Sequence, residues 1–204
     1  MPEIFETPNS MRLKIAVFGR TNSGKSSIIN AICSQRVSLV SEVSGTTTDP
    51  VNRAMEIYPL GPCVLVDTAG FGDETELGEI RTERTRAVME GTDLAVMVLS
   101  PETEELFLEK DWLRLLEDAE IPTVCVLNKA DLVSDISAAL EKIKAETGAL
   151  CVAVSALTGT GMAELKAALI EKAPKDFEQS SITGHIARRG DTVLLVMPQQ
   201  INAP

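Results

Sequence analysis

The chain has 204 residues, of which 44% are hydrophobic and 3% aromatic, enough for one α/β domain and a small appendage but not for two full domains. The formal net charge of −11 disfavours a nucleic-acid partner, because proteins that bind phosphate backbones usually carry a basic face. No run of 18 or more uncharged apolar residues is present, and the N-terminal segment lacks the features of a signal peptide. We therefore expect a cytoplasmic protein with no membrane partner and no nucleic-acid partner.

Apolar runs of strand length alternate with helix-like segments along most of the chain. The runs are continuous rather than alternating in polarity, which favours strands buried on both faces. They cover Leu13 to Phe18, Cys63 to Val66, Leu94 to Leu99, Thr123 to Leu127 and Leu150 to Val154. The helix-like segments cover Lys25 to Cys33, Arg81 to Glu90, Glu104 to Ala119, Ile136 to Thr147 and Met162 to Lys172. This order predicts a doubly wound α/β fold: a mostly parallel six-stranded sheet, helices on both faces, and an antiparallel edge strand at Val51 to Ile57.

The pattern stops after Pro174, which suggests a domain boundary. Lys175 to Ser181 is polar and is followed by an isolated apolar run, Thr192 to Met197. Because one strand cannot bury itself, we expect residues 1–174 to form the main domain. Residues 175–204 are then a linker and the truncated beginning of a second domain.

The cysteines do not indicate a metal site. Cys33, Cys63, Cys125 and Cys151 are far apart in the sequence and have no C-x-x-C spacing. Cys125 and Cys151 fall inside apolar runs, so we expect small buried side chains there rather than redox groups.

A glycine-rich loop follows the first predicted strand. Gly19 to Ser26 match G-x-x-x-x-G-K-[ST], and a helix-like segment comes next. The glycines let the backbone curl so that successive N–H groups point at one anion at a helix N-terminus. Lys25 would supply charge to the β- and γ-phosphates, and Ser26 a hydroxyl ligand for Mg²⁺. The expected phosphate contacts are Asn22, Ser23, Gly24, Lys25, Ser26 and Ser27.

Two later segments match the switches of phosphate-binding-loop enzymes. The first, Gly45 to Asp49, would contribute a threonine that binds Mg²⁺ only in the presence of a γ-phosphate. We expect this to be Thr47, with Thr46 and Thr48 as alternatives. In the second, the sequence D-T-A-G ends a predicted strand.

The D-T-A-G segment supplies two further expected contacts. Asp67 would hold Mg²⁺ through a water, and the backbone N–H of Gly70 would sense the γ-phosphate. Lys25, Thr47 and Gly70 are therefore the expected catalytic residues.

The sequence N-K-A-D after the strand Thr123 to Leu127 identifies the base. Asp131 can accept hydrogen bonds from guanine N1–H and the exocyclic amine, whereas adenine would leave the carboxylate unpaired. Asn128 would contact the base or brace the phosphate-binding loop, and the Lys129 stem would lie over the ring. A third segment, Ser155, Ala156 and Leu157, would place a backbone N–H near guanine O6. Together the motifs predict GTP and GDP as ligands, with Mg²⁺ as the metal ion.

The order of these motifs resembles the TrmE–Era–EngA-like branch of the small GTPases. In that family an asparagine at the position of Asn22, with a G-T-T-T-D switch, marks potassium-activated members. The resemblance implies that Asn22 is a K⁺ ligand, together with backbone carbonyls around Val43 to Gly45. Phe71 stands where Ras-like enzymes have the glutamine that orients water, so hydrolysis must use another group or be slow. Glu76 and Glu79 are candidates.

Flanking segments are similar to the [FeFe]-hydrogenase maturation GTPases, the HydF family. They are Thr7 to Ser10, Leu77 to Arg81 and Arg189 to Pro198. In that family a dimerisation domain and an iron–sulfur domain follow the GTPase domain, and the whole protein is a scaffold or carrier for the hydrogenase's di-iron subcluster. The resemblance implies that the partners of this domain are those two domains and other hydrogenase maturation proteins. It also allows a homodimer. Because the chain has no Cys/His cluster, we expect no iron–sulfur cluster on it.

Three functions fit this sequence. The first is slow GTP hydrolysis as a molecular switch, and the second is nucleotide-gated docking of partners in a metallocluster scaffold. The third is tRNA modification or ribosome assembly, since proteins with those functions share every motif described above. The acidic balance and the lack of a recognisable RNA-binding module count against the third.

Overall fold

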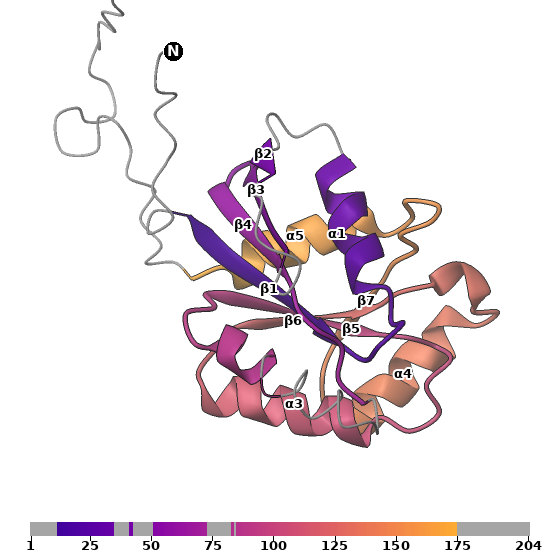
Figure 1. Cartoon of the computed structure of the whole chain (residues 1–204). Helices are drawn as coiled ribbons and strands as arrows, with labels where there is room; N and C mark the ends of the chain where they lie inside the picture. Colours follow the sequence, from indigo (N-terminus) through magenta and orange to yellow (C-terminus); the bar gives the residue numbers. More distant parts are fainter. Residues whose placement is uncertain (1–11, 35–40, 43–50, 73–82, 84, 175–204) are drawn as a thin grey trace, which may run out of the picture.

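A central sheet, mostly parallel, organises the chain (Figure 1). The computed structural model describes residues 12–34, 41–42, 51–72, 83 and 85–174. The strands are β1 Leu13–Gly19, β2 Ser41–Glu42, β3 Val51–Ile57, β4 Gly61–Asp67, β5 Leu94–Leu99, β6 Thr123–Leu127 and β7 Cys151–Ala153. The helices are α1 Lys25–Ser34, α3 Phe107–Asp118, the 3₁₀-helix η2 Ala130–Leu132, α4 Ile136–Thr147 and α5 Met162–Lys172. Residues 85–89 are also helical.

The strand order confirms the predicted doubly wound fold but corrects the predicted strand count. Within the described residues the sheet has seven strands, in the order β2-β3-β4-β1-β5-β6-β7. β4, β1, β5, β6 and β7 run parallel to one another, whereas β3 is antiparallel to β4. The extra strand, β2, pairs antiparallel with the outer side of β3, so β3 is not the edge strand. A strand of two residues is too short for a periodic pattern to predict.

Alternate side chains of each strand pack against opposite helix layers. In β1, Leu13, Ile15 and Val17 belong to the core cluster that includes residues of α1 and α5. Ala16 and Phe18 belong to the cluster that includes residues of α3 and α4. Figure 1 shows these two pairs of helices on opposite faces of the sheet. Because both faces are covered, the strands need apolar residues at successive positions, as the sequence has.

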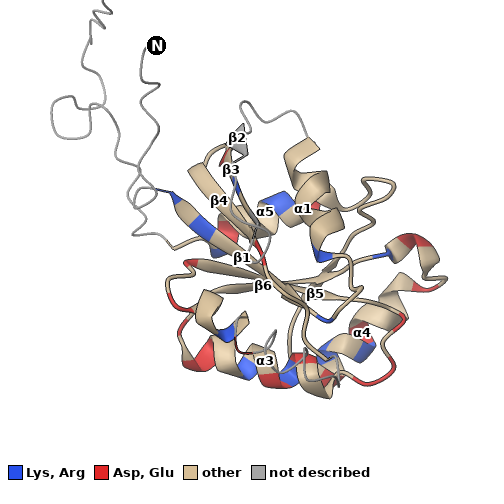
Figure 2. Ribbon diagram, viewed as in Figure 1, with Lys and Arg blue, Asp and Glu red and all other residues tan. Residues whose placement is uncertain are grey.

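Charged residues lie mainly on the helices and loops (Figure 2). β5 and β6, in the middle of the parallel part of the sheet, contain no charged residue. Within the described ranges, the molecule has no helix that combines the length and apolarity needed to cross a bilayer.

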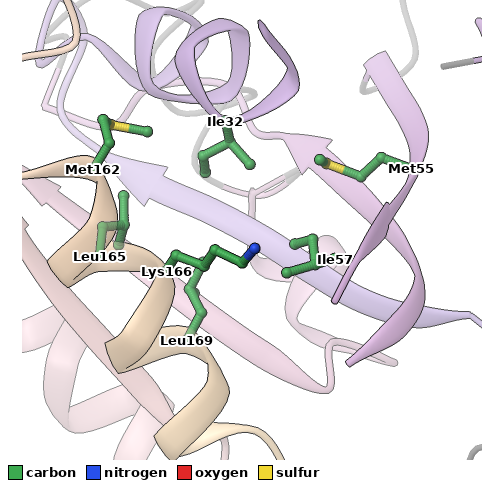
Figure 3. Close-up of a pocket in the computed structure, with 7 residues that line it drawn as sticks. All are labelled: Ile32, Met55, Ile57, Met162, Leu165, Lys166 and Leu169. Atoms are coloured by element: carbon green, nitrogen blue, oxygen red, sulfur yellow. The ribbon is translucent and has the colours of Figure 1, made fainter. Parts of the chain in front are cut away.

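A small apolar hollow lies between α1, β3 and α5 (Figure 3). Its lining residues are Ile32, Met55, Ile57, Met162, Leu165, Lys166 and Leu169. The Lys166 side chain extends across it toward Ile57, so its methylene groups cover apolar surface. None of the expected nucleotide contacts lines this hollow.

The fold brings two cysteines together that are distant in the sequence. Cys125 on β6 and Cys151 on β7 occupy paired positions of neighbouring parallel strands. All four cysteines are free thiols. Cys125 is buried, as expected, whereas Cys151, for which a buried side chain was also expected, is half-buried because it lies on the short outer strand β7. Cys63 is buried and Cys33 is half-buried. Burial raises the pKa of the Cys63 thiol to about 12.

The described residues end at Pro174. The predicted linker and second domain, residues 175–204, therefore lie outside the described residues.

Candidate nucleotide-binding site

The phosphate-binding loop connects β1 to α1 and uses backbone conformations that favour glycine. Gly19 and Gly24 have φ angles of 153° and 91°, and Asn22 has a φ of 64°. A Cβ atom at Gly24 would lie 2.2 Å from Nδ2 of Asn128. Two glycines are therefore required to close this loop against its neighbours.

Lys25 is buried beneath the loop. Its Nζ donates hydrogen bonds to the carbonyl oxygens of Gly19 at 3.0 Å and Arg20 at 2.8 Å. Desolvation lowers the pKa of Lys25, and the nearby carboxylate of Asp67 partly opposes that effect. A buried ammonium with incomplete compensation is suited to attract phosphate oxygens.

An unpaired buried hydroxyl also fits a phosphate ligand. Ser23 is 2% exposed, and its Oγ has no hydrogen-bond partner among the described residues. Buried polar atoms without a partner are rare and call for an explanation. A phosphate oxygen in the loop would supply the missing partner.

Two expected Mg²⁺ ligands lie side by side. The Oγ of Ser26 at the start of α1 donates a hydrogen bond of 2.5 Å to Oδ2 of Asp67 at the end of β4. Hydroxyl and carboxylate oxygens are ligands of the kind that Mg²⁺ prefers, so this pair fits the ion. The third expected ligand, Thr47, and its alternatives Thr46 and Thr48 lie outside the described residues.

The D-T-A-G segment packs directly on the phosphate-binding loop. A Cβ at Gly70 would lie 2.6 Å from the backbone nitrogen of Thr21, so only glycine fits this contact. The next residue, Phe71, exchanges backbone hydrogen bonds with the loop: Thr21 N–H donates to Phe71 O at 3.1 Å, and Phe71 N–H donates to Gly19 O at 3.4 Å. Any movement of Gly70 would therefore displace the phosphate-binding loop.

Asn128 joins three of the predicted segments. Its Nδ2 donates to the carbonyl of Ser23 at 3.1 Å, and its Oδ1 accepts from the Ala156 N–H at 3.2 Å. Asn128 is 2% exposed, so both contacts are shielded from water. Of the two roles expected for this residue, the structure shows the bracing contact with the loop.

Asp131 is held by the last motif. The buried Ser155 hydroxyl donates to Oδ1 of the exposed Asp131 at 2.5 Å. A carboxylate has about four acceptor positions, so most of them are left for a base. Ser155 thus sets the orientation of the carboxylate that the sequence assigns to guanine.

Lys129 and Leu157 belong to the same two motifs as Asp131 and Ser155. Lys129 has a left-handed backbone conformation with φ of 58°, and its ammonium forms an ion pair with Glu102. That hydrogen bond lowers the pKa of Glu102. Leu157 is 86% exposed and makes no core contact, which leaves its side chain free for a ligand or solvent.

The structure brings together most, though not all, of the predicted site residues. Those that meet at the carboxyl ends of β1, β4, β6 and β7 are Ser23, Gly24, Lys25, Ser26, Asp67, Gly70, Asn128, Asp131, Ser155 and Ala156. Asn22 and Ser27 are exposed on the loop and on α1. The carbonyls of Val43 to Gly45 and the candidates Glu76 and Glu79 lie outside the described residues.

One pair of contacts is absent from the sequence-based prediction. Arg20, at the β1 end of the phosphate-binding loop, forms a salt bridge of 2.6 Å with Glu109 on α3. Phe71 is buried and stacks on Trp112 of the same helix, with ring centroids 5.1 Å apart. The sequence carries one signal of the Arg20–Glu109 contact. Glu109 lies on the same helix face as Leu106, Trp112 and Leu116, where an apolar residue is expected.

Comparison with known proteins gives one family. Residues 14–129 match the 50S ribosome-binding GTPases. The tRNA modification GTPase MnmE of Aquifex aeolicus is 37% identical over 184 residues, which are 89% of this chain and 39% of that protein. GTPase Era of Xanthomonas oryzae pv. oryzae is 35% identical over 169 residues, which are 79% of this chain and 55% of that protein. The chain thus spans well under two thirds of these relatives' length.

Solved structures agree on the fold. Era of Aquifex aeolicus bound to GDP and AlF₄⁻ has a TM-score of 0.65 at 23% identity, over 79% of this chain and 57% of that one. Era in complex with MgGDPNP and nucleotides 1506–1542 of 16S ribosomal RNA has a TM-score of 0.64 at 23% identity, with the same coverage. The RNA belongs to that complex. At 23% identity this likeness concerns the fold alone.

Proposed function

Because this chain belongs to the 50S ribosome-binding GTPase family and is a GTP-hydrolysing domain of the TrmE–Era–EngA type, we propose that it is a Mg²⁺-dependent molecular switch. The observation that best supports this proposal is the convergence on one edge of the sheet. There the buried Lys25 meets the Ser26–Asp67 pair, Gly70 and the Asn128 brace. The site thus contains a cation for phosphate, ligands for Mg²⁺ and, at Asp131, acceptor oxygens for the base.

Three residues prepare the phosphate chain for attack by water. Lys25 neutralises charge on the β- and γ-oxygens, and Ser26 and Asp67 hold Mg²⁺. When bound, Mg²⁺ neutralises the charge that develops as the β–γ bond breaks. The backbone N–H of Gly70 detects the γ-phosphate, because the glycine lies against Thr21 of the loop.

Guanine selectivity follows from Asp131. Ser155 orients the carboxylate, and a site built to pair with two guanine donors rejects adenine, which would leave the charge unpaired. Ala156 contributes an N–H at the same edge; in the structure it donates to Asn128.

Water must be oriented by a group other than the residue after Gly70. Phe71 is 2% exposed and stacked on Trp112, so it presents nothing polar to the nucleophile. We propose slow intrinsic turnover that K⁺ accelerates, with exposed Asn22 as one ligand and Thr47 as the γ-phosphate sensor of the first switch. The support for this proposal is the position of Asn22 at a left-handed turn of the loop.

Phosphate release from GTP in matched KCl and NaCl buffers tests this mechanism. We expect faster turnover in KCl, loss of that stimulation in Asn22→Ala, and unchanged GDP affinity in the variant. Turnover indifferent to the cation would rule out K⁺ activation while leaving the GTPase assignment intact. Absence of GTP binding would overturn the whole site.

For the complete protein we propose a cytoplasmic scaffold or carrier function in [FeFe]-hydrogenase maturation, with dimerisation and iron–sulfur domains beyond this one. This rests on the flanking segments Thr7 to Ser10, Leu77 to Arg81 and Arg189 to Pro198. The second candidate is tRNA modification or ribosome assembly, which the MnmE and Era relatives favour. Deleting the gene separates the two. Loss of hydrogenase activity with normal tRNA nucleosides supports the first, and altered nucleosides or ribosome profiles with normal hydrogenase support the second.

A further inference from the structure

The two ends of the phosphate-binding loop are held by different elements. Asn128, after β6, binds the carbonyl of Ser23 near the end of the loop that leads into α1. At the β1 end, Arg20 reaches α3 instead: its Nε lies 2.6 Å from Oε1 of Glu109 and its Nη2 lies 3.1 Å from Oε2. The two ends of the loop thus have separate anchors, Asn128 at the α1 end and Glu109 at the β1 end.

Glu109 is an unusual residue for the inner face of a helix. It is 1% exposed, and its carboxylate receives both hydrogen bonds from one planar guanidinium. Nη2 of Arg20 also donates to the carbonyl of Glu105 at 2.8 Å, and the guanidinium lies 5.5 Å from the Phe107 ring centroid. A buried carboxylate with this two-point geometry fixes the direction of its partner.

The same helix holds the start of the second switch. Phe71 stacks on Trp112 with an interplanar angle of 15°, and Trp112 also packs on Phe18 of β1. The backbone of Phe71 is hydrogen-bonded to Gly19 and Thr21, the two residues on either side of Arg20. Gly70 immediately precedes Phe71 in the chain. Its position therefore depends on the stacking of Phe71 on Trp112 and on the backbone hydrogen bonds between Phe71 and the loop.

We propose that Glu109 is a positioning residue for GTP hydrolysis: through Arg20 it fixes the β1 end of the phosphate-binding loop and, through the attached Phe71, the γ-phosphate sensor Gly70. This rests on the proposed function. The contacts of Asn128 and Asp131 do not involve Arg20, so we expect loss of the anchor to leave GDP affinity unchanged. The γ-phosphate response depends on it.

Glu109→Gln in the 204-residue chain tests this division. The variant keeps the size of the side chain and loses the charge. We expect kcat for GTP to fall about tenfold to 100-fold, because displaced groups impair the reaction even when chemistry is remote. GDP affinity stays unchanged. Asp111→Asn is the matched control, because it removes an exposed acid of α3 whose ion pair with Arg114 is 3.8 Å long, and it leaves kcat unaltered.

Trp112 supplies a readout that stability alone would not change. It is the chain's single tryptophan and stacks on Phe71, so its fluorescence should differ between the GDP form and a form with a non-hydrolysable GTP analogue. We expect Glu109→Gln to abolish this difference and Asp111→Asn to retain it. If Glu109→Gln lowers the unfolding temperature but keeps both kcat and the fluorescence response, the positioning function is wrong.

A second substitution tests the proposal in case Glu109→Gln folds poorly. Arg20→Lys keeps the positive charge but lacks the fork that engages both carboxylate oxygens, so it should show the same loss of kcat with unchanged GDP affinity. Equal losses of GDP affinity and kcat in Arg20→Lys would mean a general structural effect and overturn the proposal. Wild-type protein that neither binds nor hydrolyses GTP would instead overturn the proposed function.

Discussion

At the residue scale, Gly24 is the point where the phosphate-binding loop meets Asn128 of the N-K-A-D motif. Its φ of 91° favours glycine, and a Cβ would lie 2.2 Å from Nδ2 of Asn128. That amide group donates to Ser23 on the loop, so it cannot withdraw without losing a buried hydrogen bond. The absence of a side chain at residue 24 therefore keeps the loop and the base pocket in register.

We predict that Gly24→Ala weakens GDP binding at least tenfold, because Asn128 must move and release both Ser23 and Ala156. Gly148→Ala is the control: Gly148 also has a positive φ, of 77°, but a Cβ there meets nothing within 4 Å. Both variants should lose about 1 kcal/mol of stability from the left-handed conformation, and Gly24→Ala should lose more because it also breaks two buried hydrogen bonds of Asn128. Only Gly24→Ala should lose nucleotide affinity. Titration with a fluorescent GDP analogue and urea unfolding measure the two effects. Equal GDP affinities would contradict the idea.

Burial of the Lys25 ammonium lowers the stability of the nucleotide-free protein but favours phosphate binding. Since desolvation lowers its pKa, the charged form is less favourable in the folded chain than in the unfolded one. The resulting cost is present at neutral pH, and it fades as the pH rises through the lowered folded pKa toward the unfolded value of 10.5. Phosphate oxygens would offset the same cost when nucleotide binds.

Lys25→Met should therefore change the unfolding free energy of the nucleotide-free protein at pH 7 by less than about 1 kcal/mol, because the lost hydrogen bonds to Gly19 and Arg20 are balanced by the relieved desolvation. GTP affinity should fall by about 100-fold or more. Urea unfolding and isothermal titration measure the two quantities. A large loss of nucleotide-free stability would show that Lys25 is mainly a structural residue.

At the scale of elements, α4 illustrates a helix whose ends are specified locally. The side chain of Asp135 accepts a hydrogen bond of 3.0 Å from the Ala138 N–H, and Gly148 ends the helix in a left-handed conformation. Both are common residue choices at these positions. The helix follows the N-K-A-D motif but takes no part in it.

Asp135→Ala should lower the unfolding free energy by about 1 kcal/mol, the usual value of a lost N-cap. GDP affinity should stay unchanged, because the Asp131–Ser155 pair does not contact the cap. Thermal unfolding with and without GDP measures both quantities. A variant with weaker GDP binding would show that the start of α4 helps to position the preceding loop.

Such local signals explain which elements could be predicted. β5, β6, α4 and α5 have the predicted bounds, since their ends coincide with changes from apolar to polar sequence or with caps. α3 begins at Phe107 rather than Glu104 and has no side-chain cap, so nothing in the sequence marks its first residue. β2 consists of two residues and exists only through pairing with β3.

The site could be predicted for a similar reason, and only in part. Its motifs place the needed side chains at the ends of particular strands, and parallel pairing then brings those ends together. Arg20 and Glu109 are 89 residues apart, and although Glu109 occupies an apolar position of its helix, nothing in the sequence pairs it with Arg20, so only the fold reveals their salt bridge. The same holds for Cys125 and Cys151, which become neighbours through the pairing of β6 with β7.

At the scale of the whole molecule, charge and family suggest different partners. The net charge of −11 opposes binding to a phosphate backbone, whereas one structural relative, Era, is known in complex with ribosomal RNA. This chain covers 39% of MnmE and 55% of Era, so the charge argument applies to this domain alone.

We predict that the 204-residue chain does not bind tRNA or ribosomal RNA fragments at about 150 mM salt, with a Kd weaker than about 10⁻⁴ M. Repulsion from its acidic surface opposes the counterion release that drives nonspecific binding, in the GDP form and with a GTP analogue alike. Fluorescence anisotropy with labelled RNA at two salt concentrations measures this, and isolated Era provides the positive control. Tight binding that weakens steeply with salt would reveal a basic patch hidden in the overall charge, and it would favour tRNA modification or ribosome assembly over hydrogenase maturation.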